Sequence, residues 1–390
     1  MKRLALVLVG ALLCAGCEEA AAPADLILSR PSLMLAASAR ITDLGMLPGG
    51  TLSIPLALNN RGQVLGFADT DVGTFRTHAF LWEQGTMADL GLDEDDLGSR
   101  VHLNQRGQVV ATFEDATGAE HAVLWQDGTV TDLGTLGGCC TFAGAINVRA
   151  QIVGSSETAS GEGHAMLWHN GTMIDLGTLG GLSGNGMAVN APGQVVGSSQ
   201  TASGESHAFL WQHGAMTDLG TLGGTFSVAF LLNERGQVAG ISETASGDQH
   251  AFLWQDGTMT DLGTLGGLSS FPTAINNQGQ VVGGSRTASG ESHAFLWQDG
   301  TMADLGTLGG AASQASAVNE HRQVVGASQT ASGQSHAFFW QRGTMTDLGT
   351  LGGGESDARF INERGQVAGT SQTTSGELHA VLWVLAARVP

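Results

Sequence analysis

The chain has 390 residues, of which 59 are glycine and none is tyrosine, and it carries a formal net charge of −20. This charge argues against nucleic acid as a partner, because an acidic surface repels a phosphate backbone. The glycines do not follow the triplet period of collagen, so a collagen triple helix is excluded as well.

The N-terminus has the layout of an export signal. Two basic residues precede a short apolar run at positions 4–13, which is too short to span a bilayer. The sequence CAGC that follows resembles a bacterial lipobox, although Cys14 stands where such motifs usually carry leucine. We therefore expect residues 1–16 to be a lipoprotein signal peptide and Cys17 to be the lipidation site. The expected location is the outer membrane or cell surface, with the lipid anchor in the membrane.

Residues 17–39 contain none of the repeated motifs found further on and are predicted to form a tether to a domain at 40–390. Within that domain three motifs occur eight times each. One is Asp-Leu-Gly, and another is an asparagine that precedes a turn and a Gln-Val or Gln-Ile pair. The third is His-Ala, two apolar residues and Trp, repeated every 43 residues at His78, His121, His164, His207, His250, His293, His336 and His379. These periods identify a repeat protein.

Each repeat is predicted to contain four short strands. In residues 269–305 the runs FPTAIN, QVVGGS, HAFLW and MADL alternate with turn signals, and none reaches helical length. Asp-Gly and Asn-Gly pairs supply the positive φ angles of two-residue hairpins. Four strands in about 43 residues match one propeller blade. We therefore predict an all-β fold, an eight-bladed β-propeller.

The two ends of the repeat region complement each other. The last repeat stops after the strand at 379–383 and lacks a fourth strand, whereas the strand at 41–44, where the first Asp-Leu-Gly begins, belongs to no complete repeat. Pairing these strands would close the ring, remove an exposed edge and place Asp43 opposite Val381. The alternative is an open β-solenoid, which would not need complementary ends.

The repeated histidines and aspartates are interpreted as structural. Alternation along the hairpin at Asn170 places His164 diagonally next to Asp175 on one face of the blade. A catalytic site is normally built once, whereas this pair recurs in every repeat. Function is instead expected where the repeats differ.

Apolar residues that follow the glycine pair differ between repeats and begin the strand that lines a propeller's channel. They form a candidate ligand rim, with packing as the alternative role. The rim residues are Phe142, Leu182, Phe226, Leu268 and Phe271.

Two further differences from the repeated sequence involve cysteines and acidic residues. Cys139 and Cys140 are adjacent and, outside the cytoplasm, could form a vicinal disulfide or remain a pair of thiols. Acidic loops could offer oxygen ligands to Ca²⁺, but they lack the EF-hand spacing, and a solvated loop is the favoured interpretation. The acidic residues are Asp69, Asp71, Asp93, Glu94, Asp95 and Asp96. No other cofactor is predicted.

The combination AIN, GQVVG, HAFLW and DLGTLGG resembles the bacterial HAF-repeat extracellular family, named for the His-Ala-Phe seen at His207, His250, His293 and His336. Two repeats carry HAVLW and one HAMLW instead. The resemblance spans nearly all of the chain after the tether. It implies an exported, β-rich protein and implies no common activity or catalytic residues.

The sequence contains no Walker loop, nucleophile elbow, HExxH or CxxC motif. We therefore predict a monomeric, non-catalytic binding scaffold whose partner is an envelope protein or glycan. One alternative is an enzyme at the channel mouth, a metal-dependent hydrolase or lyase acting on polysaccharide. The other is a structural surface protein without a specific ligand.

Overall fold

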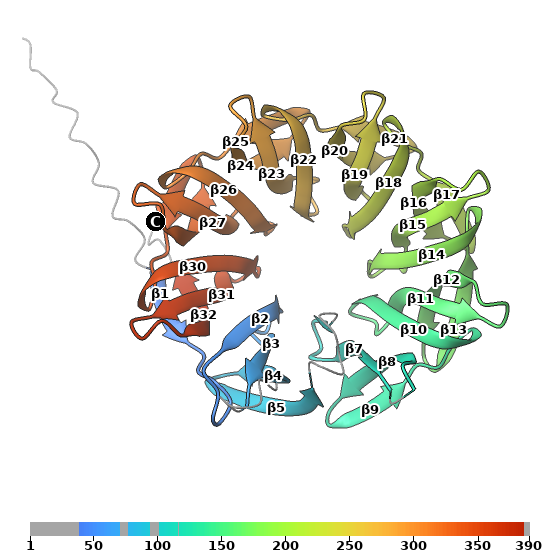
Figure 1. Ribbon diagram of the computed structural model, residues 1–390, viewed down its shortest axis with the longest axis horizontal. Coiled ribbons are helices and arrows are strands. Elements are labelled where there is room, and N and C mark those ends of the chain that lie inside the picture. Colours follow the sequence, from blue (N-terminus) through green and yellow to red (C-terminus); the bar gives the residue numbers. More distant parts are fainter. Residues whose placement is uncertain (1–38, 71–76, 94–100, 116, 386–390) are drawn as a thin grey trace, which may run out of the picture. The chain divides into compact units, whose positions relative to one another are not determined.

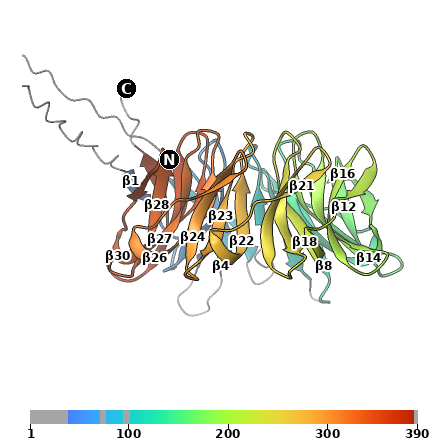
Figure 2. The same cartoon turned by 90° about the horizontal axis from the view of Figure 1, so that it is seen from above.

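The computed structural model describes residues 39–70, 77–93, 101–115 and 117–385. These residues form 32 strands grouped into four-stranded blades around a central opening (Figure 1), and Figure 2 shows the same ring from the side. The predicted all-β, eight-bladed propeller is confirmed. Within the described ranges no helix is long and apolar enough to cross a bilayer.

Blades 1 to 7 each contain four consecutive strands, and blade 8 combines the last three strands with the first. Blade 1 contains β2 (Ser53–Leu58), β3 (Val64–Asp69), β4 (Thr77–Glu83) and β5 (Thr86–Asp93), and blade 2 contains β6 (Val101–Leu103), β7 (Val109–Glu114), β8 (Glu120–Gln126) and β9 (Thr129–Asp132). Blade 3 contains β10 (Gly137–Ile146), β11 (Ile152–Thr158), β12 (Gly163–His169) and β13 (Thr172–Gly177), and blade 4 contains β14 (Gly180–Val189), β15 (Val195–Thr201), β16 (Ser206–Gln212) and β17 (Ala215–Asp218). Blade 5 contains β18 (Gly223–Leu232), β19 (Val238–Thr244), β20 (Gln249–Gln255) and β21 (Thr258–Asp261), and blade 6 contains β22 (Gly266–Ile275), β23 (Val281–Thr287), β24 (Ser292–Gln298) and β25 (Thr301–Asp304). Blade 7 contains β26 (Gly309–Val318), β27 (Val324–Thr330), β28 (Ser335–Gln341) and β29 (Thr344–Asp347), and blade 8 contains β30 (Gly352–Ile361), β31 (Gln366–Thr373), β32 (Leu378–Leu385) and β1 (Ala39–Asp43).

The hairpin between the third and fourth strands has the predicted register. In blade 3, Trp168 lies opposite Met173 and Met166 lies opposite Asp175. The intervening turn has φ 50° at Asn170 and φ 80° at Gly171. Two consecutive positive φ angles are the signature of a type I′ turn, whose twist suits a tight antiparallel hairpin.

The hydrophobic core lies between neighbouring blades. Ala208 and Leu210 of blade 4 pack in one cluster with Val238 and Phe252 of blade 5. Alternation along each strand thus gives every blade one face with smaller side chains and one face with bulky side chains. The smaller face of one blade packs against the bulky face of the next around the ring. The phenylalanine of the repeated motif is fully buried wherever it occurs, at Phe80, Phe209, Phe252, Phe295 and Phe338. Each burial contributes about 2–3 kcal/mol.

The first and last strands meet in blade 8. β1 pairs antiparallel with β32, and Asp43 lies opposite Val381, as the offset between the repeats predicts. The Asp43 carboxylate also lies 2.8 Å from His379 Nδ1. β1 covers Ala39–Asp43, at the start of the described residues.

A circuit of asparagine hydrogen bonds links all eight blades. In each blade the Nδ2 of the repeated asparagine donates to the backbone oxygen of its counterpart in the next blade, over 2.8–3.2 Å. The last of these bonds runs from Asn362 to Asn59 over 3.1 Å. The donors are Asn59, Asn104, Asn147, Asn190, Asn233, Asn276, Asn319 and Asn362. The asparagine motif therefore joins neighbouring blades.

Candidate functional site

The repeated histidine and aspartate form a brace within each blade. Their Nδ1 to carboxylate distances run from 2.7 Å to 3.2 Å. In blade 5, Asp261 lies 2.9 Å from His250 Nδ1 and accepts the backbone N–H of Gly263 over 2.7 Å. The carboxylate therefore fixes both the hairpin of the third and fourth strands and the turn that follows the fourth strand. The structural interpretation of this pair agrees with the geometry.

Replacing His250 with alanine is expected to lower the free energy of unfolding by about 0.5–1.5 kcal/mol, because it removes one hydrogen bond from the Asp261 carboxylate, which keeps only that from Gly263. The folded fraction should retain its ligand binding. Chemical denaturation followed by Trp fluorescence measures the first effect. Loss of binding at unchanged stability would contradict a structural role.

The Asp115 carboxylate has a strongly lowered pKa for a local reason. The Thr117 side chain and the backbone N–H groups of Thr117 and Ala119 donate to it and lower its pKa to about 2. These bonds close the hairpin loop of blade 2. The lowered pKa of Asp115 therefore results from the hydrogen bonds of a turn and does not indicate a catalytic acid.

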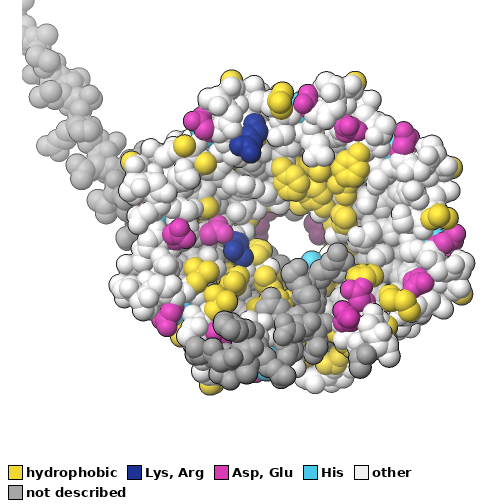
Figure 3. All heavy atoms as spheres, viewed as in Figure 1, with side chains coloured by type: hydrophobic (Ala, Val, Ile, Leu, Met, Phe, Trp, Pro, Cys, Tyr) yellow, Lys and Arg dark blue, Asp and Glu magenta, His cyan; other side chains and the backbone are white. Residues whose placement is uncertain are grey.

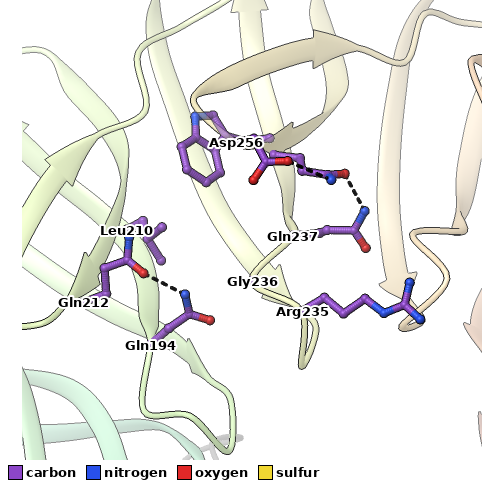
Figure 4. Close-up of a pocket in the computed structure, with 9 residues that line it drawn as sticks. Gln194, Leu210, Gln212, Arg235, Gly236, Gln237 and Asp256 are labelled. Atoms are coloured by element: carbon purple, nitrogen blue, oxygen red, sulfur yellow. Dashed lines mark hydrogen bonds between the residues drawn. The ribbon is translucent and has the colours of Figure 1, made fainter.

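At the end of the strands that carries the short turns, neighbouring blades form a polar pocket (Figure 4). The pocket between blades 4 and 5 has a volume of about 300 Å³, with Trp254 among its lining residues. Gln194 donates to Gln212 over 2.8 Å, and Gln237 donates to Gln255 over 2.7 Å. Arg235 extends away from these amides in Figure 4. Because the same glutamine pair recurs in blades 2 and 6, we interpret this network as scaffolding.

The strongest differences between blades lie on the first strand of each blade, which lies nearest the central opening (Figure 1). Two positions on this strand, five and three residues before the repeated asparagine, change chemical class from blade to blade. The first position carries Ile54, Phe142, Asn185, Val228, Phe271, Gln314 and Asp357. The second carries Leu56, Val101, Gly144, Met187, Phe230, Thr273, Ser316 and Arg359. The residue directly before the asparagine, by contrast, is aliphatic in every blade.

One arc of the opening is aromatic. The rings of Phe230, on β18, and Phe271, on β22, stack with centroids 5.2 Å apart. Phe271 remains 47% exposed, which is unusual for a side chain of this size. Figure 3 shows apolar side chains gathered beside the opening on this side.

Another arc, on β30, is charged. Arg359 donates from Nε to Asp357 over 3.0 Å, and both side chains are about one-third exposed. Figure 3 shows a basic side chain at the opening on that side. The mouth of the propeller is therefore chemically asymmetric although its framework is repeated.

Blade 6 departs from the repeat at positions that adjoin the aromatic arc. In blades 4 and 5, Gln200 and Glu243 accept the backbone N–H of the first strand over 3.1 Å and 2.9 Å. Blade 6 has Arg286 at this position, which cannot accept and instead donates to the Gly290 oxygen over 2.9 Å. Gly284 stands where blade 5 has Ile241.

Two pockets result at this place. One, of about 210 Å³, lies beside Phe271 and is lined by polar groups that include Gln249, Ser292 and Gln314. The other, of about 530 Å³, is lined by Leu268 and the loop that follows Arg286. Both pockets share Arg286, so an aromatic face, amides, hydroxyls and a guanidinium converge on one region.

The structure places the five predicted rim residues unequally. Leu182, Leu268 and Phe271 are 64%, 72% and 47% exposed, whereas Phe142 and Phe226 are half-buried. Leu268 and Phe271 join the two pockets of blade 6. The other three lie on the first strands of blades 3, 4 and 5 and line neither of these pockets.

Sequence reasoning did not identify Phe230, Gly284 or Arg286 as site residues. The available signal was their departure from the repeat, since Arg286 stands where other blades have an acid or glutamine. Their proximity to one another depends on contacts between blades.

The predicted cysteine and acidic groups have different surroundings. Cys139 and Cys140 are joined by a disulfide at the start of β10. Asp69 is buried and accepts the backbone N–H groups of Thr51 and Leu52 over 2.7 Å and 2.6 Å, which gives it a structural role. The backbone of Asp93 ends β5. The remaining acids, Asp71, Glu94, Asp95 and Asp96, lie outside the described residues.

No family model matches the chain, and no curated protein matches it. Among solved structures, the β-propeller domain of the Trilobed protease from Pyrococcus furiosus is similar at 9% identity and a TM-score of 0.50, over 77% of this chain and 98% of that one. The BP39L lectin from Burkholderia pseudomallei is similar at 12% identity and a TM-score of 0.41, over 90% and 96%. TolB from Acinetobacter baumannii is similar at 13% identity and a TM-score of 0.34, over 68% and 52%. At 9% identity the similarity to the Trilobed protease domain shows a β-propeller fold and no activity.

Proposed function

We propose that this protein is an exported, lipid-anchored β-propeller that binds a glycan of the cell envelope at the blade 6 side of its channel mouth. One observation carries the proposal. The framework repeats around the ring, whereas the departures at Phe271, Gly284 and Arg286 meet at two adjoining pockets. These three departures therefore lie together on one region of the surface, as the residues of a ligand site would.

The chemistry of these pockets suits a sugar ring. The exposed face of Phe271 can cover the apolar C–H face of a pyranose, because the ring face carries partial negative charge. Gln249, Gln314 and Ser292 offer donors and acceptors for hydroxyl groups. Arg286 adds a planar set of donors. A few polar groups beside an aromatic wall are typical of small-ligand sites.

The test exchanges residues between blades. Arg286→Glu and Gly284→Ile install the residues of blade 5, and Gly284 has room for a Cβ, whose nearest contact would be 3.4 Å from Gln314. A screen against envelope glycans should find a ligand for the wild-type protein. Each exchange, and Phe271→Ala, should weaken binding about tenfold or more, which corresponds to about 1.4 kcal/mol. Gln329→Glu, which installs the same residue at the equivalent position of blade 7, serves as the control and should bind normally.

Two outcomes of this screen would reject the proposed site. One is a glycan that binds all of these variants as tightly as it binds the wild-type chain. The other is the absence of any glycan ligand, with a purified envelope protein binding instead.

Anchoring is tested separately at Cys17. Cys17→Ser should abolish metabolic labelling with a fatty acid and release the protein from the membrane fraction, because lipidation requires the thiol. Cys14→Ser is the control and should leave labelling intact. Unchanged labelling of Cys17→Ser would show that Cys17 is not the anchor.

A further inference from the structure

Three metal-ligating side chains converge at the start of β10, outside the pockets of blade 6. They belong to Cys139, Cys140 and Glu157, and their ligand atoms all lie within 4.8 Å of one another. Cys139 is exposed and the other two side chains are half-buried, so solvent reaches the cluster. No equivalent cluster of cysteines is present elsewhere in the described ranges.

The local backbone explains how the sulfurs of two adjacent cysteines come together. Neighbouring residues of a regular strand project to opposite faces. The register between β10 and β11 shifts between Gly137 and Thr141, which interrupts this alternation across both cysteines. The backbone irregularity therefore brings the two sulfurs together before any metal is considered.

Glu157 is held in place by the repeat. Its Oε2 accepts the backbone N–H of Cys139 over 3.3 Å, as Glu243 accepts that of Thr225 in blade 5. The framework thus fixes this carboxylate in blades 3 and 5. Only in blade 3 does that position face a cysteine pair.

The same carboxylate oxygen lies 2.6 Å from Cys139 Sγ. A disulfide sulfur has no proton to donate, so in the oxidised form this contact brings two electron-rich atoms together. A cation bound by both atoms would hold them roughly 3.5 Å apart, because zinc lies about 2.3 Å from sulfur and 2.0–2.2 Å from oxygen at a tetrahedral angle. The contact shows that the carboxylate and the sulfur are close enough to reach one ion after a small separation.

We propose that reduced Cys139 and Cys140, together with Glu157, form a site for a thiophilic divalent cation of the zinc class. Thiolate and carboxylate are both zinc ligands, at about 2.3 Å and 2.0–2.2 Å, and water would complete the coordination. The mixed ligand set disfavours Ca²⁺ and Mg²⁺, which prefer all-oxygen sites. Oxidation to the vicinal disulfide removes both thiolates, so the site is controlled by redox state.

The redox step is a thiol–disulfide exchange. A dithiol of the oxidoreductase class attacks the Cys139–Cys140 disulfide, and its own two thiols are oxidised to a disulfide. Two electrons and two protons pass to the cysteine pair. Binding of the cation then releases the protons of the two thiols.

The test uses the purified full chain, reduced with a phosphine and kept free of oxygen. Titration with Cd²⁺ should produce a thiolate-to-metal charge-transfer absorption that saturates near one ion per chain, and Zn²⁺ should displace it. Cys139→Ser with Cys140→Ser should abolish the absorption, and Glu157→Gln should weaken binding about tenfold or more. Glutamine can keep the backbone contact, as Gln200 does for Leu182 in blade 4.

Glu243→Gln is the matched control, because it changes the equivalent hydrogen bond between a carboxylate and the first strand in a blade without cysteines. It should bind Cd²⁺ like the wild-type chain, and circular dichroism should show that all variants are folded. The proposal is overturned if the double serine variant keeps the absorption, if the oxidised chain binds equally well, or if the reduced chain binds no Cd²⁺. A loss of affinity in Glu243→Gln equal to that in Glu157→Gln would also overturn the role of Glu157.

Discussion

Phe252→Ala is expected to lower the free energy of unfolding by about 3–5 kcal/mol. Phe252 is fully buried and packs against Ala208 and Leu210 of the preceding blade, so its loss leaves a cavity at a junction between blades. Chemical denaturation measured by circular dichroism gives the difference. The residue occupies the apolar centre of the repeated motif, so this experiment asks whether the motif is there to pack blades.

The matched control is Phe271→Ala, which removes the same ring from an exposed position. Its expected cost is below about 1 kcal/mol, because a side chain that keeps nearly half its surface in water leaves little cavity behind. Equal losses for the two variants would contradict the assignment of Phe252 to packing and Phe271 to the ligand site.

Deletion of residues 39–45 is expected to lower the free energy of unfolding by about 3 kcal/mol or more and to promote aggregation. The deletion removes β1 from β32 and takes away Leu44, which is 5% exposed. It also exposes an apolar strand that contains Trp383, which is fully buried. Unpaired backbone groups on such a strand are a template for association. Thermal unfolding and light scattering measure the two effects.

A deletion of the same length within the predicted tether, residues 20–26, is the control. It should leave both the unfolding midpoint and the scattering unchanged. If the two deletions behave alike, β1 contributes nothing to the ring.

Periodicity explains how much of the fold could be predicted from the sequence. A 43-residue period with four strand signals specifies a blade, and the alternation of Met166 and Trp168 fixes the hairpin register. The mismatch between the two ends of the repeat region predicts the partner of β1, because Asp43 and Val381 occupy the places that Asp175 and Met166 occupy in blade 3. Each of these inferences needs only local pattern and counting.

The candidate site could be predicted only in part. Phe271 and Leu268 could be recognised in the sequence because they differ from the equivalent residues of other repeats. The stacking of Phe271 on Phe230 could not, because it joins two blades. The pocket that Gly284 leaves open depends on Gln314 of the next blade. Likewise, Glu157 lies 18 residues from Cys139 and meets it only through the pairing of β10 with β11. Contacts between elements decide these sites, and the period of a sequence does not encode them.

The most direct measurement of the closed ring is a disulfide between positions 43 and 381. Leu44 donates its backbone N–H to Ala380, which places the Asp43–Val381 pair at a site of the ladder without direct hydrogen bonds. Opposed Cα atoms at such sites lie about 4.5 Å apart, within the range of a disulfide. With Cys139 and Cys140 replaced by serine, Asp43→Cys with Val381→Cys should form an intramolecular crosslink on oxidation, whereas Asp43→Cys with Val238→Cys in blade 5 should not. Crosslinking of both pairs alike, or of 43 to 381 only between two chains, would contradict a ring closed by β1.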